Sequence, residues 1–79
     1  MSVEITVYSK PSCVQCEATY RALKQNNISY RVIDISQDDE ALKHVRRLGH
    51  MQAPVVETPS GHWSGYRPDR IKELASIFA

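Results

Sequence analysis

The sequence lacks the features that mark several large classes of protein. It has no apolar run near the ~20 residues that a membrane-spanning helix needs, and its formal net charge is only +1. A chain with so little charge and no basic stripe lacks the electrostatic footprint of a nucleic-acid-binding protein. Its first residues also lack the charged and apolar regions of a secretory signal. We therefore expect a cytoplasmic protein that binds neither nucleic acid nor membrane.

The chain is also short, and this limits its organisation. Its 79 residues suffice for one domain, expected over 1–79. Hydrophobic residues make up 42% of the composition, which is too apolar for a disordered chain and ordinary for a globular one. The predicted helices leave no apolar stripe uncovered, so a monomer is the default expectation.

Hydrophobic periodicity predicts an α/β fold. Alternating or β-branched segments favour strands at 3–8, 29–35, 53–58 and 62–64. Amphipathic segments favour helices at 13–26 and 37–48, with Ser12 and Ser36 as N-caps, and a last helix that begins within 66–70. The order β-α-β-α-β-β-α predicts a four-stranded mixed sheet with three helices. The first two strands should run parallel, because a helix joins them.

Only two cysteines are present, Cys13 and Cys16, and both fall at the start of the first helix. Disulfide exchange needs a thiolate, an accessible sulfur and a second thiol. The unpaired N–H groups of the helix start favour an anionic Cys13, and Lys10 adds positive potential. Val14 and Gln15 set no carboxylate against it. We predict that Cys13 attacks a partner disulfide and that Cys16, one turn later, resolves the mixed disulfide.

Other uses of two close cysteines stay open. Structural zinc requires four ligands, and His44, His50 and His62 are scattered along the chain. We therefore expect no metal site within one chain, whereas a zinc or iron–sulfur site built by two chains remains an alternative. A third interpretation is an interaction domain whose thiols are incidental.

Two further segments carry a structural and a functional interpretation. The Ala53-Pro54 pair either starts an edge strand or forms a cis peptide bond opposite the cysteines, where the Ala53 backbone pairs with an extended partner. In the stretch 62–70, HWSGYRPDR, the aromatic side chains either belong to the core or form an apolar and basic rim that docks a protein. His62 is more typical of a surface hydrogen-bonding residue, and Arg70 of a solvated helix charge.

Three stretches together resemble one family. CVQC at 13–16, QAPVV at 52–56 and WSGYRPD at 63–69 are similar to the NrdH-redoxins, glutaredoxin-like proteins with thioredoxin-like activity. The resemblance covers essentially the whole chain and implies a thioredoxin/glutaredoxin fold. It implies a disulfide reductase that donates hydrogen to the large subunit of class Ib ribonucleotide reductase. Thioredoxin reductase would supply the electrons from NADPH, and the chain itself would bind no cofactor.

The resemblance also implies roles for particular residues. Cys13 would be the nucleophile, Cys16 the resolving thiol and Pro54 a cis-proline. The implied partner-binding residues are Lys10, Val14, Gln15, Ala53, Pro54, Trp63, Ser64, Gly65, Tyr66, Arg67 and Pro68. His62, Asp69 and Arg70 would form a supporting hydrogen-bonded network.

The chain departs from related patterns at two places. Tyr66 stands where NrdH-redoxins usually have phenylalanine, so the packing around its hydroxyl is an open question. Glutaredoxins that use glutathione carry a glycine pair and paired acids here, whereas this chain has Ser64-Gly65 and the single acid Asp69. The resemblance therefore implies that glutathione is a poor reductant. A glutathione-dependent glutaredoxin is the alternative within redox chemistry.

Overall fold

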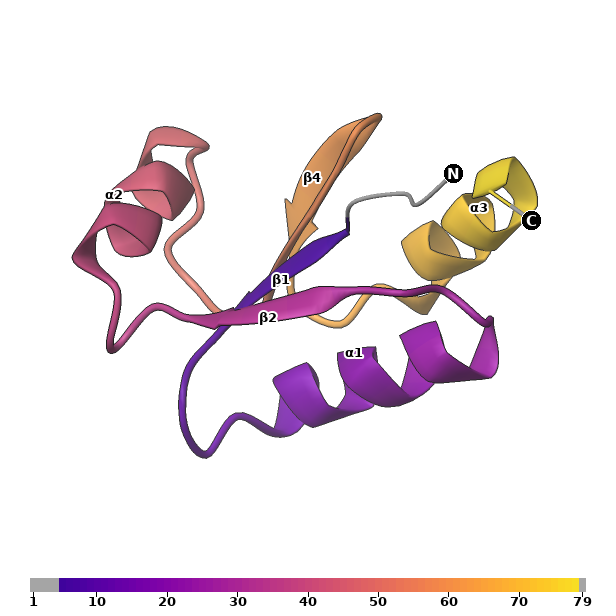
Figure 1. The fold of residues 1–79 in the computed structure, drawn as a ribbon, viewed down its shortest axis with the longest axis horizontal. Helices are drawn as coiled ribbons and strands as arrows, with labels where there is room; N and C mark the ends of the chain where they lie inside the picture. The colour runs from indigo at the N-terminus through magenta and orange to yellow at the C-terminus, as the bar shows by residue number, and fades with distance from the viewer. Residues whose placement is uncertain (1–4, 79) are drawn as a thin grey trace.

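A computed structural model of the protein describes residues 5–78 and shows three helices and a four-stranded sheet (Figure 1). The elements are β1 (Thr6–Ser9), α1 (Val14–Gln25), β2 (Arg31–Asp34), α2 (Asp39–Arg47), β3 (Val55–Thr58), β4 (Gly61–Ser64) and α3 (Pro68–Phe78). This order confirms the predicted β-α-β-α-β-β-α arrangement. None of the three helices in the described range has the length and apolar character to cross a membrane.

The sheet is mixed, with the strand order β2-β1-β3-β4. β1 pairs with β2 in parallel and with β3 in antiparallel orientation, and β3 and β4 form a hairpin. All four residues of β1 are buried, because β1 lies inside the sheet and both of its faces are covered. The predicted parallel βαβ unit is therefore confirmed.

The helices cover both faces of the sheet, and side-chain alternation along β1 serves both layers. α1 and α3 lie on one face and α2 on the other (Figure 1). Val7 belongs to the core on the α1 and α3 side, and Tyr8 to the core under α2. The larger core, on the α1 and α3 side, contains Ile5, Val7, Ala22, Leu23, Val56, Trp63, Ile71 and Leu74. The smaller core, under α2, contains Tyr8, Ala41, Val45 and Val55.

The starts of two helices differ from the prediction. Ser12 adopts a positive φ of 58°, and Cys13 is the N-cap of α1. Ser36 donates its N–H and its hydroxyl to the Asp34 carboxylate, at 2.9 and 2.6 Å. The cap of α2 is instead Asp38, whose Oδ1 accepts the Ala41 N–H at 3.0 Å. Each wrong prediction has the same cause, which is that several neighbouring side chains can accept from a free helix N–H.

β2 and β3 are shorter than predicted, β1 extends to Ser9 and β4 begins one residue earlier than predicted, at Gly61, whereas two helix ends are confirmed. Of the strand predicted at 3–8, positions 3 and 4 lie outside the described residues. Asn27 and Gly49 follow α1 and α2 with positive φ angles of 57° and 93°. After α2, the N–H groups of Gly49 and His50 bond back to the carbonyls of Arg46 and Val45, at 3.0 and 3.2 Å. This Schellman closure turns the chain toward the sheet.

Candidate active site

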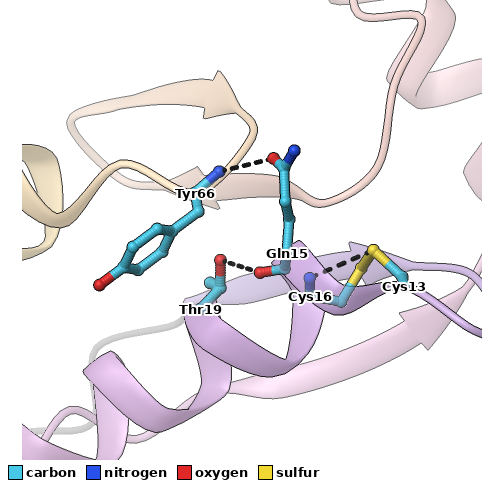
Figure 2. Close-up of a disulfide and its surroundings, with 5 residues drawn as sticks. All are labelled: Cys13, Gln15, Cys16, Thr19 and Tyr66. Atoms are coloured by element: carbon cyan, nitrogen blue, oxygen red, sulfur yellow. Dashed lines mark hydrogen bonds between the residues drawn. A yellow bond between two sulfur atoms is a disulfide. The ribbon is translucent and has the colours of Figure 1, made fainter.

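Cys13 and Cys16 form a disulfide where the loop after β1 enters α1, with their Cα atoms 5.2 Å apart (Figure 2). The two sulfur-bearing residues differ in access to solvent. Cys13 is half-buried, whereas Cys16 is only 2% exposed. An incoming thiol therefore reaches Cys13 first.

The start of α1 shapes the electrostatics of Cys13. Its Sγ takes the place of the usual side-chain oxygen of an N-cap and accepts the Cys16 N–H at 3.1 Å. The free N–H groups and the dipole of the first turn favour negative charge at this position. In the reduced protein the same donor stabilises a thiolate, which is the reactive form of cysteine.

Gln15 connects the cysteine turn to the segment between β4 and α3. Its Oε1 accepts the Tyr66 N–H at 3.2 Å, while the Tyr66 ring points away from it (Figure 2). Next to this contact, the Gly65 N–H donates to the Pro54 carbonyl at 2.8 Å. The Ala53-Pro54 peptide bond is cis, which confirms the predicted bond geometry, while the pairing of the Ala53 backbone with a partner stays a prediction. Residues from all three recognised stretches thus meet at one end of the sheet.

Two shallow depressions flank Cys13. One, of about 400 Å³, is lined on its far side by Met51, Gln52 and Ala53. The other, of about 380 Å³, extends along α1 to Tyr20. Lys10, Ser12, Cys13 and Val14 line both. These depressions can receive an extended segment on either side of the reactive sulfur.

Exposed apolar side chains border the first depression, and sequence analysis missed one of them. Val14 and Met51 are each 83% exposed. Val14 was a predicted site residue, but Met51 was not, because its position depends on the path of the loop after α2. Its only sequence signal is an apolar residue shortly before Pro54. Tyr20, at the end of the second depression, is half-buried.

The segment 63–70 divides between core and surface. Trp63 is 6% exposed and lies in the larger core, with the Arg70 guanidinium carbon 5.2 Å from its ring centroid. Tyr66 is 41% exposed. Ser64 pairs with Val55 in the β3–β4 ladder, and Pro68 begins α3.

The exposed Arg67 and Asp69 form an ion pair with two hydrogen bonds, 3.2 and 3.0 Å long. Hydrogen bonding within the pair holds the pKa of Asp69 below its ordinary value and raises that of Arg67. The carboxylate of Asp69 is therefore already occupied by a cation of the same chain.

His62 lies apart from this group. It is directly opposite Glu57 in the β3–β4 ladder, and its neighbour Trp63 points to the other face of the sheet. Its Nδ1 lies 2.7 Å from Nε2 of His50, in the loop after α2. Within residues 5–78 there is no group of three or more histidine, cysteine or acidic side chains that could hold a metal ion.

Comparison with known proteins gives a consistent result. A family model described as Glutaredoxin matches residues 5–63. The chain is 39% identical to the glutaredoxin-like protein NrdH of Escherichia coli K12 over 72 residues, which is 91% of this chain and 89% of that protein. It is 34% identical to the NrdH of Lactococcus lactis subsp. cremoris over 71 residues, or 90% and 99% of the two chains.

A solved structure agrees with these relatives. The NrdH-redoxin of Escherichia coli, described there as glutaredoxin-like with a thioredoxin-like activity profile, superposes with a TM-score of 0.86 at 39% identity. The match covers 90% of this chain and 93% of that one.

A cysteine pair at disulfide distance on a thioredoxin-type sheet, with one sulfur accessible, defines a thiol–disulfide oxidoreductase. The matched family model and the relatives specify it further. This chain belongs to the glutaredoxin family and, within it, to the NrdH-redoxins.

Proposed function

We propose that this chain is a monomeric, single-domain, cytoplasmic electron donor to class Ib ribonucleotide reductase, and that thioredoxin reductase reduces it at the expense of NADPH. The observation that carries the proposal is the accessible Cys13 at a helix start, with Cys16 buried behind it. The similarity to NrdH proteins along nearly the whole chain supports the choice of partners.

The chemistry transfers two electrons in two exchange steps. The Cys13 thiolate attacks one sulfur of the partner's disulfide, and the partner's second sulfur leaves as a thiolate. Cys16 then loses its proton and attacks Cys13 Sγ, so that the partner's first sulfur leaves. The products are a Cys13–Cys16 disulfide and a partner dithiol, whose protons come from solvent.

Recognition of the partner would depend on the depression beside Cys13. Val14 and Met51 offer apolar contact area, and Ala53 lines the same depression. An extended protein segment can pair with exposed backbone groups with little dependence on its sequence. Gln15 holds the Tyr66 backbone next to this region.

The acidic group in the first turn of α3 argues against glutathione as the usual reductant. Asp69, the one acid in the stretch 62–70, is bound to Arg67 in a two-bond ion pair. Its carboxylate would have to leave that pair in order to receive the amino group of glutathione.

Reconstitution tests the proposal. The protein is combined with NADPH, thioredoxin reductase and a class Ib ribonucleotide reductase, and deoxyribonucleotide formation is followed together with NADPH oxidation. A parallel reaction replaces thioredoxin reductase with glutathione and glutathione reductase. We expect turnover in the first system and little in the second.

The double variant C13S/C16S is the control for electrons that bypass the protein. Turnover with glutathione alone would favour the glutaredoxin alternative. Turnover in neither system, from a protein that still reduces model disulfides, would contradict the assigned partners.

A further inference from the structure

The wall of the depression opposite Cys13 is a segment with few hydrogen bonds to the rest of the protein. It consists of Met51, Gln52 and Ala53, between the end of α2 and Pro54. Within residues 5–78, these three residues make no backbone hydrogen bond outside the helices and strands and no side-chain hydrogen bond. Their positions therefore depend on the anchors at the two ends of the segment.

The anchor after the wall is part of the active site. The Gly65 N–H donates to the Pro54 carbonyl at 2.8 Å. The anchor before the wall is His50, whose N–H closes α2 and whose ring contacts His62 on β4. The two ring nitrogens are 2.7 Å apart, and the rings meet edge to face with centroids 4.9 Å apart. This is the one side-chain hydrogen bond between the loop after α2 and the sheet within the described range.

We propose that the His50–His62 hydrogen bond is a latch that positions the Met51–Ala53 wall for protein disulfides, and that protonation of both rings opens it. One ring nitrogen must donate and the other must accept, so the bond needs at least one ring with an unprotonated nitrogen. When both rings carry two N–H groups, two donors and two positive charges face each other. His50 and His62 are thus positioning residues for exchange at Cys13, without contact with the sulfurs.

The charged groups around the pair agree with this behaviour. Burial, and then the neighbouring His62, hold the pKa of His50 below its ordinary value. Lys10 and Arg46 line the same cavity of about 100 Å³ as His50 and add positive charge on its side.

An acid lies on the other side of the pair. Glu57 stands opposite His62 in the β3–β4 ladder, but its carboxylate is already bound by Tyr8 and His44. The second proton on the pair therefore meets the positive charges of Lys10 and Arg46, while the Glu57 carboxylate is already hydrogen-bonded to Tyr8 and His44.

The test uses pre-reduced protein in single turnover with a short synthetic peptide closed by one disulfide. Reactions run at about pH 7.5 and about pH 4.5, because the pKa of His50 lies below the ordinary histidine value of about 6.5. A chelator is present throughout, so that stray metal cannot bridge the rings. Hydroxyethyl disulfide, which is too small to span the depression, reports the intrinsic reactivity of the thiols.

Two variants at one position separate the latch from general damage. H62A removes one partner of the bond, whereas H62N keeps a side-chain oxygen that can accept from His50 at either pH. At about pH 7.5 we expect H62A to raise the peptide concentration at half-saturation about fivefold, the scale of one net hydrogen bond, and H62N to restore most of it. On acidification, the half-saturation concentration of wild type should approach that of H62A, while that of H62N should stay lower. The ratio of the half-saturation concentrations of wild type and H62N at each pH removes the pH dependence of the thiolate.

H44Q is the matched control, since it removes the histidine outside the pair and should keep the acid step. The latch is refuted if H62N shows the same acid step as wild type, or if H62A weakens both substrates equally. Nitrogen-15 NMR of wild type supplies a test that needs no variant. The second ring protonation should coincide with shifts of the Met51 and Gln52 amides, and its absence from those amides would also refute the latch. No assay here uses ribonucleotide reductase, so the outcome is independent of the partner proposal.

Discussion

At the scale of single residues, the division of labour between the cysteines follows from one hydrogen bond and one difference in burial. Cys13 Sγ accepts a backbone N–H and faces solvent, while Cys16 is enclosed by the core side of α1. Nucleophilic attack on an outside disulfide needs the accessible sulfur. Attack within the protein needs only proximity, which the spacing of one helical turn supplies.

This difference predicts opposite behaviour for the two serine variants. C16S should accumulate a mixed disulfide with the disulfide peptide, because nothing resolves it, whereas C13S should form almost none. Non-reducing electrophoresis and intact-mass measurement of the adducts check this, with C13S/C16S as the blank. Comparable trapping by both single variants would show that the two sulfurs are equally accessible.

The sequence was informative at this scale wherever chemistry depends on residues close together in the chain. The CVQC spacing at the start of a predicted helix indicated both cysteines and their roles. Neither Met51 at the depression nor the contact between His50 and His62 could be predicted. Each depends on how the loop after α2 returns to the sheet, and no local propensity encodes that path.

At the scale of elements, the junction between β4 and α3 is held by close packing against the start of α1. Gly65 has a φ of 82°, and a Cβ added to it would lie 3.3 Å from Gln15 Oε1. Gly49, after α2, has a similar φ of 93° but nothing within 4 Å of an added Cβ. The two glycines thus share a backbone requirement and differ only in their surroundings.

We expect G49A and G65A each to lose about 1–2 kcal/mol of unfolding free energy, the cost of the left-handed conformation for a residue with a Cβ. G65A should lose more than G49A, because the Gln15 side chain must also move. In a Q15A background, the difference in lost unfolding free energy between G65A and G49A should become smaller. Urea denaturation of G49A and G65A, each in the wild-type and the Q15A background, measures these differences. The same difference between G65A and G49A in both backgrounds would argue against the Gln15 contact.

Element types were predictable because hydrophobic periodicity reflects which face is buried, but exact starts were not. The sequence pattern predicted Ser12 and Ser36 as N-caps. In the fold, Cys13 and Asp38 are the N-caps instead. Competing acceptors within two residues differ little in free energy, so the tertiary path of the incoming chain decides between them.

At the scale of the whole molecule, a polar cluster ties α2 to the sheet on the face opposite α1. Tyr8 donates its hydroxyl to Glu57 at 2.9 Å, and His44 Nε2 lies 2.9 and 3.0 Å from the two carboxylate oxygens. Burial, and then the bond to Glu57, raise the pKa of Tyr8 to about 12. Burial would raise the pKa of Glu57, but hydrogen bonds from His44 and Tyr8 outweigh it and hold that pKa below its ordinary value.

The shift of Tyr8 predicts a loss of stability in alkali. The unfolded chain releases the phenolic proton near pH 10 and the folded chain only near 12. Stability is therefore full below pH 10 and falls as pH rises toward 12, by about 2–3 kcal/mol for this group. Urea unfolding of wild type and Y8F across that range measures it. The alkaline loss should be smaller in Y8F, and an identical loss would assign it to other groups.

The unequal burial of the two sulfurs also constrains traffic through the protein. Because Cys16 is enclosed, whatever gives electrons and whatever takes them must dock over the same atom of Cys13. The electron donor and the electron acceptor therefore bind in turn and exclude each other, and no complex contains both at once. Its kinetics should accordingly be ping-pong, and an excess of either partner protein should inhibit the binding of the other.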